Sequence, residues 1–259
     1  MTDTKPPVIE ICNLHKSYGD LEVIKGVDIS AQAGDVVSLI GSSGSGKSTV
    51  LRCANLLENS QKGDVIFQGE AVKWRGKGLH RHPADKHQVI RIRTNLSMVF
   101  QQFNLWAHMT ILQNVMEAPV TVLGHDKAEA EANARAYLDK VGIGDKCDAW
   151  PAQLSGGQQQ RAAIARALAM EPQALLFDEP TSALDPELEQ EVVKVIKDLA
   201  AEGRTMLLVT HDMRLAADVS DKVIFLHQGC VEEQGPPETL FKQPKSERLQ
   251  QFLSATVSD

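Results

Sequence analysis

The chain has 259 residues, and its 27 basic and 34 acidic residues give a net charge of −7. Hydrophobic residues make up 42% and charged residues 24% of the sequence, which is typical of a globular protein of one large domain. This composition excludes a disordered chain and a collagen-like fibre. No apolar run reaches the roughly 18 residues that a membrane-spanning helix needs, which excludes an integral membrane protein. The acidic balance argues against nucleic acid as a partner.

The cysteines and the first residues indicate the compartment. Cys12, Cys53, Cys147 and Cys230 are scattered, without the paired spacing of a disulfide framework or a zinc site. We therefore expect reduced thiols in a reducing compartment. The first seven residues lack the apolar core of a signal peptide. The sequence predicts a cytoplasmic protein whose role at a membrane, if it has one, is exerted through partners.

In chain order, residues 8–33 come first and alternate apolar with polar side chains. This pattern predicts short, half-buried strands of an antiparallel sheet. Residues 36–40 are nearly all apolar, which favours a strand buried on both faces of a parallel sheet. Three later runs have the same character and lie at 174–177, 206–209 and 223–226. Helical periodicity at 186–201 and 212–219 separates them, so the sequence predicts a parallel α/β fold.

The middle of the chain differs from this pattern. Residues 127–141 are rich in alanine and glutamate and predict a surface helix. We expect a mostly helical insertion at 103–165 within a core formed by residues 8–102 and 166–259. Residues 62–93 carry eight Lys or Arg against three Asp or Glu. This basic stretch could contact phosphates or an acidic membrane surface, or it could be a solvated face.

A phosphate-binding motif follows the buried strand at 36–40. Residues 41–48, here called the phosphate loop, fit the pattern G-x-x-x-x-G-K-[ST] and lead into a helix predicted from Lys47 to about Leu57. The loop and the next residue are Gly41, Ser42, Ser43, Gly44, Ser45, Gly46, Lys47, Ser48 and Thr49. Its backbone N–H groups would cradle phosphates at the positive end of the helix. Lys47 would reach the β- and γ-phosphates, and Ser48 would offer a hydroxyl to Mg²⁺.

Two carboxylates narrow the choice among nucleotide-binding proteins. Asp178 and Glu179 follow the apolar run at 174–177. Asp178 would hold Mg²⁺, often through water. Side chains alternate along a strand, so Glu179 would point differently and polarise an attacking water as general base. Solvation of a strand end is the alternative interpretation.

A second anion site is predicted at residues 154–158, here called the LSGGQ segment. Ser155 is a natural helix N-cap, and Gly156, Gly157 and Gln158 follow it at the start of a helix that runs through Ala169. One ATP has no use for two complete phosphate cradles in one subunit. We therefore expect a head-to-tail dimer in which each nucleotide lies between the phosphate loop of one subunit and the LSGGQ segment of the other.

With these motifs in this order, nearly the whole chain resembles the ATPase subunit of ATP-binding-cassette (ABC) transporters. The resemblance implies one ABC ATPase domain over residues 8–259. Its expected architecture is a P-loop NTPase (RecA-like) parallel-sheet core, an N-terminal antiparallel β subdomain and an inserted helical subdomain. The implied cofactors are ATP and Mg²⁺, and the implied assembly is a homodimer.

The resemblance also assigns roles to single residues. Tyr18 occupies the place of the aromatic residue that stacks on adenine. Gln101 resembles the glutamine that contacts Mg²⁺ and the water, although Gln102 is adjacent and could take that place. Asp185 closes the Ser182–Asp185 loop that crosses the dimer interface in the family, and His211 resembles the histidine that contacts the γ-phosphate. Since no catalytic position departs from the family pattern, we expect a competent ATPase.

Residues 103–110 and 114–119 look like those of importer ATPases for polar amino acids, such as histidine, lysine/arginine/ornithine and opine systems. That resemblance implies two separate transmembrane permease subunits and, indirectly, a periplasmic solute-binding protein. The chain would then lie peripherally at the cytoplasmic face of the bacterial inner membrane. Four apolar side chains could form a groove for a coupling helix of the permease, or simply pack the insertion: Phe103, Leu105, Trp106 and Met109.

Three other functions remain as alternatives. An export or lipid-handling ATPase would favour a fused transmembrane segment, which the sequence lacks. A superfamily ATPase of DNA repair or translation would favour a long coiled-coil insertion or two cassettes. A nucleotide kinase would leave the LSGGQ segment unexplained.

Overall fold

The structure is a computed structural model that describes residues 6–256. Within this range the larger sheet has six strands, parallel except for β12. In spatial order they are β12 (Cys230–Gly235), β11 (Lys222–His227), β3 (Val36–Ile40), β10 (Met206–Val209), β9 (Ala174–Asp178) and β8 (Leu96–Val99). The smaller sheet is antiparallel, in the order β2 (Leu21–Ala31), β1 (Ile9–Tyr18), β4 (Lys62–Phe67) and β5 (Glu70–Ala71).

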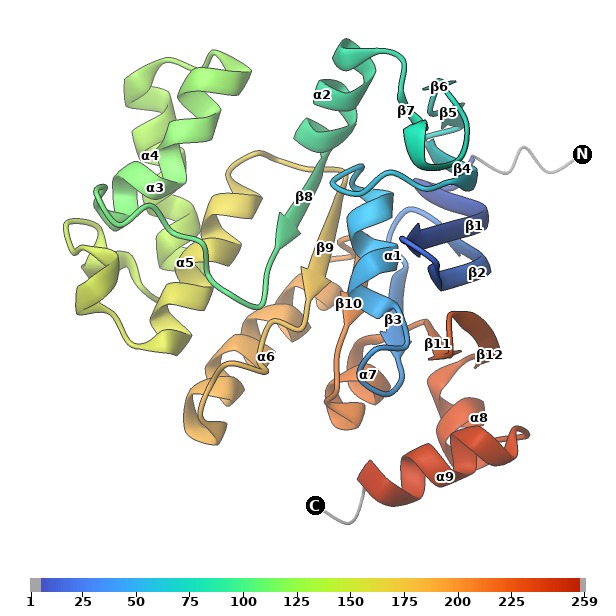
Figure 1. Ribbon diagram of the computed structural model, residues 1–259. Helices are drawn as coiled ribbons and strands as arrows, with labels where there is room; N and C mark the ends of the chain where they lie inside the picture. The colour runs from blue at the N-terminus through green and yellow to red at the C-terminus, as the bar shows by residue number, and fades with distance from the viewer. Residues whose placement is uncertain (1–5, 257–259) are drawn as a thin grey trace, which may run out of the picture.

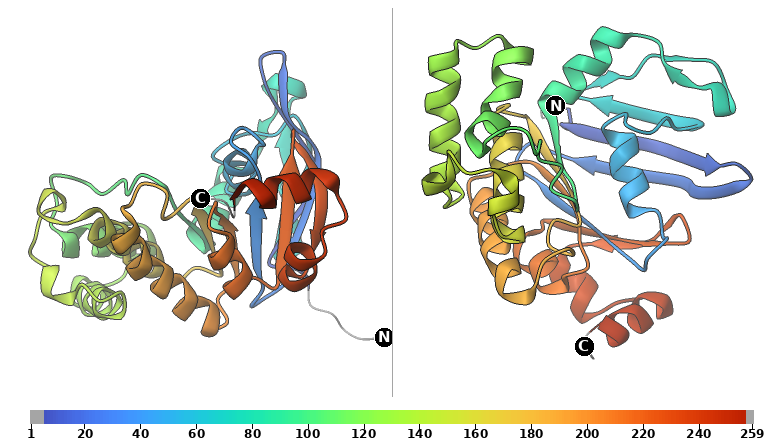
Figure 2. Two further views of the ribbon diagram at one scale, coloured as in Figure 1. Left: turned by 90° about the horizontal axis from the view of Figure 1, so that it is seen from below. Right: turned by 60° about the vertical axis from the view of Figure 1, so that its left-hand side comes forward.

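Helices alternate with the parallel strands. They are α1 (Lys47–Ala54), α2 (Lys86–Asn95), α3 (Ile111–Ala118), α4 (Lys127–Lys140), α5 (Gly156–Leu168), α6 (Pro186–Ala201), α7 (Met213–Val219), α8 (Pro237–Lys242) and α9 (Glu247–Thr256). Short helical turns and a ribbon complete the described chain: η1 (Gly78–His80), η2 (Pro119–Leu123), η3 (Gly144–Lys146), η4 (Pro151–Gln153), β6 (Trp74–Arg75) and β7 (His82–Pro83). Figures 1 and 2 place α3, α4 and α5 at one end of the molecule and the antiparallel sheet at the other.

The sheet core explains why the apolar runs form buried strands. Every residue of β3, β9 and β10 is buried. Successive residues of β9 face opposite sides, because Leu176 packs with α1 and the antiparallel sheet whereas Phe177 packs with the inserted helices. Both sides of the sheet are therefore covered by apolar side chains. The parallel α/β core and the antiparallel N-terminal sheet confirm the fold predicted from the sequence.

The structure differs from the sequence-based expectation at one helix end, and it places one expected subdomain boundary inside a helix. Helix α1 ends at Ala54, three residues earlier than expected, because Asn55 caps it and Leu56 takes a left-handed conformation with φ 56°. Helix α5 continues through Leu168, so the boundary placed at residue 165 falls inside this helix.

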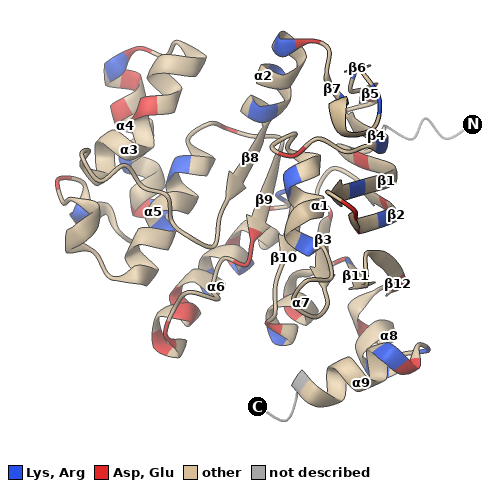
Figure 3. Cartoon of the chain, in the orientation of Figure 1, with Lys and Arg blue, Asp and Glu red and all other residues tan. Residues whose placement is uncertain are grey.

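The basic stretch 62–93 is folded rather than a loop. It contains β4, β5, the β6–β7 ribbon and α2, whose Lys and Arg residues are blue in Figure 3. Two of its arginines stabilise the fold. Arg81 stacks on Trp74 with 4.2 Å between the guanidinium carbon and the ring centroid, and Arg93 donates to the Leu56 carbonyl oxygen at 2.7 Å. Among residues 6–256, no helix has both the length and the apolarity to cross a membrane.

Candidate nucleotide-binding and catalytic site

The phosphate loop connects β3 to α1 at the carboxyl end of the parallel sheet, where Figure 1 shows it below α1. Its glycines are required by close contacts. A Cβ on Gly41 would lie 2.3 Å from the Leu226 carbonyl oxygen, and one on Gly46 would lie 2.4 Å from Ile24 Cδ1. Both glycines have positive φ, 145° and 104°, which disfavours other residues. Strands β2 and β11 therefore hold the loop from two sides.

Lys47 places a buried cation inside the loop. Its Nζ donates to the carbonyl oxygens of Gly41 at 2.8 Å and Ser42 at 3.2 Å, and lies 3.9 Å from Glu179 Oε1. Burial lowers the pKa of Lys47, while the nearby carboxylates of Glu179 and Asp178 act in the opposite direction. The ammonium group is thus held between the loop backbone and the acidic strand end.

Asp178 ends β9 and presents an unsatisfied carboxylate oxygen. The side chain is buried, and its Oδ1 has no hydrogen-bond partner, while Oδ2 lies 3.5 Å from Arg52 Nη2. A buried polar atom without a partner is costly, so such an atom is suited to a bound cation or its water. Mg²⁺ typically binds through one or two carboxylates and keeps several waters. The donor set of Asp178 and the Ser48 hydroxyl therefore fits Mg²⁺.

Glu179 is oriented by a turn and not by the strand alternation expected from the sequence. It follows β9 with φ 51°, and its backbone N–H donates to the Val209 carbonyl oxygen at 3.0 Å. Its Oε1 lies 2.7 Å from His211 Nε2, from the loop after β10. The hydrogen bond with His211 lowers the pKa of Glu179, burial opposes this, and the charges of His211 and Lys47 add to the lowering. Glu179 is therefore held as a carboxylate.

A cavity of about 290 Å³ lies between the phosphate loop and Glu179. It is lined by Val23, Ser43, Gly44, Gly46, Lys47, Ser48, Thr49, Gln101 and Glu179. Gln101 lines the cavity and Gln102 does not, which favours the first of the two glutamines. A second cavity, about 280 Å³, shares Glu179 and adds Ser182 and His211. Sequence-predicted residues from three separate segments thus meet around Glu179.

Tyr18 lies at the end of β1 with 45% of its surface exposed. It does not line the cavity of the phosphate loop. Sequence reasoning did not single out two cations beside predicted site residues. Arg52 lies next to the Asp178 carboxylate, and Lys16 lies next to the Tyr18 ring. The alternation of β1, which places Lys16 and Tyr18 on one face, could have drawn attention to the lysine.

The LSGGQ segment forms the start of α5 and caps itself. Ser155 Oγ accepts from the Gln158 backbone N–H at 3.3 Å, and Gln158 Oε1 accepts from the Ser155 N–H at 3.0 Å. The glycines serve close packing: a Cβ on Gly156 would lie 3.0 Å from Leu184 Cδ2, and one on Gly157 would lie 3.2 Å from the Leu188 carbonyl oxygen. No residue of this segment lines the cavity of the phosphate loop.

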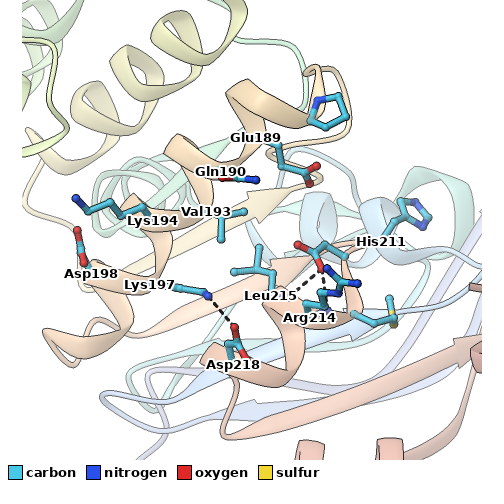
Figure 4. Close-up of a pocket in the computed structure, with 13 residues that line it drawn as sticks. Glu189, Gln190, Val193, Lys194, Lys197, Asp198, His211, Arg214, Leu215 and Asp218 are labelled. Atoms are coloured by element: carbon cyan, nitrogen blue, oxygen red, sulfur yellow. Dashed lines mark hydrogen bonds and ion pairs between the residues drawn. The ribbon is translucent and has the colours of Figure 1, made fainter. Parts of the chain in front are cut away.

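Asp185 begins the helix against which this segment packs. It is exposed and occupies the N-cap position of α6, where its carbonyl oxygen accepts from the N–H groups of Leu188 and Glu189. A larger groove, about 1020 Å³, runs between α6 and α7 (Figure 4). His211 lies at one end of this groove, and the Lys197–Asp218 ion pair, 2.7 Å, lies on its wall.

The fold and this site define a nucleotide-binding protein with a phosphate loop at the carboxyl edge of a parallel sheet. Residues 24–182 match the protein-family model described as ABC transporter. The chain is 57% identical to the arginine/ornithine transport ATP-binding protein AotP of Pseudomonas aeruginosa, over 96% of this chain and 98% of that protein. It is also 57% identical to the octopine permease ATP-binding protein P of Rhizobium radiobacter, over 95% of each chain.

A further transport protein and a solved structure are also similar to this chain. The histidine/lysine/arginine/ornithine transport ATP-binding protein HisP of Escherichia coli is 57% identical over 96% of this chain and 98% of its own. The dimeric structure of MJ0796, a bacterial ABC transporter cassette, superposes with a TM-score of 0.77 at 33% identity, covering 88% of this chain and 98% of that one. The chain therefore belongs to the ABC transporter family, and it is an ATP-binding ATPase of that family, as the sequence predicted.

Proposed function

We propose that the chain is the ATP-hydrolysing subunit of a bacterial importer for polar amino acids, with basic amino acids or opines as the solutes. The observation that carries this proposal is the 57% identity over nearly the full length to ATP-binding proteins of arginine/ornithine, octopine and histidine/lysine/arginine/ornithine transport. The ATPase itself does not touch the solute, so the assignment rests on this kinship.

In the proposed reaction Glu179 orients and deprotonates a water in line with the γ-phosphate. Its lowered pKa keeps it ionised, and it is held by His211 at 2.7 Å and by Lys47 at 3.9 Å. Lys47 and His211 offset the negative charge that develops on the phosphate oxygens. The backbone N–H groups of the phosphate loop hold the β- and γ-phosphates without side-chain competition, because no side chain caps α1.

Ser48, Gln101 and Asp178 are the proposed ligands or near neighbours of Mg²⁺. When bound, this cation would neutralise charge on the β- and γ-phosphates. Asp178 supplies the buried oxygen without a partner, and the Ser48 and Gln101 side chains line the adjacent cavity. These residues fix where the triphosphate lies relative to Glu179.

The working unit is proposed to be a head-to-tail homodimer. The LSGGQ segment stays outside the cavity of its own phosphate loop, and Ser155 is exposed. A second subunit would bring Ser155, Gly156, Gly157 and Gln158 to the γ-phosphate across the interface. Asp185, at the exposed start of α6, would face the partner. MJ0796, a related cassette, has a dimeric structure.

Coupling to a pair of permease subunits is proposed to run through residues 103–165, the helical unit joined to the core at Gln101. A groove of about 300 Å³ lies between this unit and the core, and Trp106, Arg93 and Arg166 are among its lining residues. Of the four apolar side chains expected in such a groove, only Trp106 lines it. Leu105 packs instead against the core of the helical unit. The chain would thereby bind at the cytoplasmic face of the inner membrane, with a periplasmic solute-binding protein as an indirect partner.

The test is uptake of labelled arginine, lysine, ornithine, histidine, glutamine, glutamate and an opine by cells that carry the native chain or Glu179→Gln. Loss of uptake of basic or opine solutes in the variant is the expected result. Loss confined to glutamine or glutamate would move the specificity while keeping an importer. Unchanged uptake of the whole panel, with native ATPase activity intact, would contradict the proposal.

A further inference from the structure

A buried lysine lies beneath the ring of Tyr18 and has no part in the site described so far. Lys16 is 6% exposed, and its Nζ lies 4.7 Å from the centroid of the Tyr18 ring. Both residues belong to β1 and are two positions apart, so they share one face of the strand. A cation over an aromatic face at this distance is attracted by the electron density of the ring.

The ammonium group of Lys16 is fixed by two further bonds. It donates to Glu58 Oε2 at 2.8 Å and to the Asn59 carbonyl oxygen at 2.9 Å. The neighbouring backbone is tied to the same segment, because Ser17 N–H donates to Gln61 Oε1 at 2.7 Å. These bonds fix the position of the Lys16 ammonium group. The Tyr18 ring is therefore attracted to a cation that does not move with it.

The segment that holds Lys16 is attached to the phosphate-loop helix. Residues 58–61 lie shortly after the end of α1 at Ala54, and the Glu58 N–H donates to the Arg52 carbonyl oxygen within that helix at 3.0 Å. The Lys16–Glu58 ion pair thus links the Tyr18 ring to the helix that starts at the phosphate loop.

We propose that Lys16 is a positioning residue that presets the orientation of Tyr18 for the nucleotide base and fixes its spacing from the phosphate loop. Lys16 holds one face of the ring, and the exposed remainder of the ring receives the base. A ring fixed in advance loses less side-chain freedom when the base stacks on it, which raises affinity. This inference rests on the proposed ATPase function and on the base-stacking role that the family resemblance implies for Tyr18.

The test compares Lys16→Met, Lys16→Arg and Tyr18→Ala in the full chain, with Lys25→Met on the exposed part of β2 as the matched control. Binding of ATP and of inorganic tripolyphosphate is measured, together with kcat at saturating ATP. We expect Lys16→Met to weaken ATP binding about tenfold, with unchanged tripolyphosphate binding and kcat. Lys16→Arg should restore affinity, and Lys16→Met should add nothing to Tyr18→Ala.

Three other outcomes would each overturn the positioning role of Lys16, for different reasons. Native ATP affinity in Lys16→Met, together with weak binding in Tyr18→Ala, would overturn the role of Lys16 and keep base stacking. Native affinity in both variants would overturn the base site itself. Equal losses for ATP and tripolyphosphate, with a lowered melting temperature, would show that Lys16 only supports the fold and would also overturn the inference.

Discussion

The phosphate loop and the LSGGQ segment both present the N-terminus of a helix, but this chain builds the two in opposite ways. No side chain caps α1, and its loop is closed in by β2 and β11. Helix α5 instead begins with a complete capping box between Ser155 and Gln158, on an exposed turn. The first terminus keeps its N–H groups for a ligand of its own subunit, whereas in the second the Gln158 N–H already donates to the Ser155 side chain.

The difference indicates how the second terminus can still serve a phosphate. In the cap, Ser155 Oγ accepts a hydrogen bond and keeps its own proton, because a hydroxyl is both donor and acceptor. A phosphate at this helix end can therefore accept a hydrogen bond from the Ser155 hydroxyl while the cap stays intact. Substitutions of Glu179, Gly157, His211 and Ser155 test this contrast and the chemistry beside it.

Glu179→Gln should lower the hydrolysis rate about 10²- to 10⁴-fold, because it removes the group that accepts the proton of water. ATP binding should persist, and the variant should accumulate as an ATP-bound dimer. Steady-state phosphate release and size-exclusion chromatography with ATP measure the two effects. Glu238→Gln, at an exposed position of α8, is the control and should behave like the native chain. A Glu179→Gln variant that stays monomeric in the presence of ATP would contradict the proposed head-to-tail dimer.

Gly157→Ala should affect the second terminus alone. Its new Cβ would lie 3.2 Å from Leu188 Cβ and from the Leu188 carbonyl oxygen, so α5 and α6 must shift slightly apart. We expect about a tenfold loss of hydrolysis, on the order of 1.4 kcal/mol, with ATP binding to the monomer preserved. Gly235→Ala, where a Cβ meets nothing within 4 Å, is the control. Weakened monomer binding of ATP in Gly157→Ala would show that the two termini are not independent.

His211→Ala should change the pH dependence of hydrolysis. The hydrogen bond from His211 is the largest cause of the lowered pKa of Glu179. A lowered folded pKa means that the carboxylate and its stabilising contacts persist above that value and are lost as pH falls through it. Without His211 the acid limb of the pH–rate profile should move to higher pH. His211→Gln, which can still donate a hydrogen bond, should move it less, and an unmoved limb in both variants would contradict Glu179 as the titrating base.

Ser155→Ala should have the smallest effect on the folded monomer, a loss of about 1 kcal/mol in the free energy of unfolding, because it removes a helix cap. Ser155→Asp can restore the cap and the stability, but its charge should repel a phosphate and leave hydrolysis low. Urea unfolding and phosphate release measure the two quantities separately. Recovery of hydrolysis in Ser155→Asp would show that the cap, and not the hydroxyl proton, is what catalysis requires.

The sequence predicted the sheet well because its strands are short apolar runs that are buried on both faces, as in β9 and β10. It also predicted the cavity around Lys47 and Glu179, since both follow such strands. It could not predict the left-handed conformation of Glu179, which depends on a bond to the neighbouring strand. Phe103, Leu105, Trp106 and Met109 could each line a groove or pack the insertion, and of these four only Trp106 lines the groove beside the core, because apolar content does not say which neighbour a side chain meets.

The last helices have a consequence for how this protein can be handled. Leu249 of α9 and Leu240 of α8 pack with Ile40 and Phe225, and the Phe252 ring lies 5.2 Å from that of Phe225. Ile40 directly precedes Gly41, so the far end of the chain supports the strand that leads into the phosphate loop. We therefore expect displacement of α9 to weaken nucleotide binding. A protease cut, a short carboxy-terminal fusion or an antibody that binds α9 could each cause that displacement.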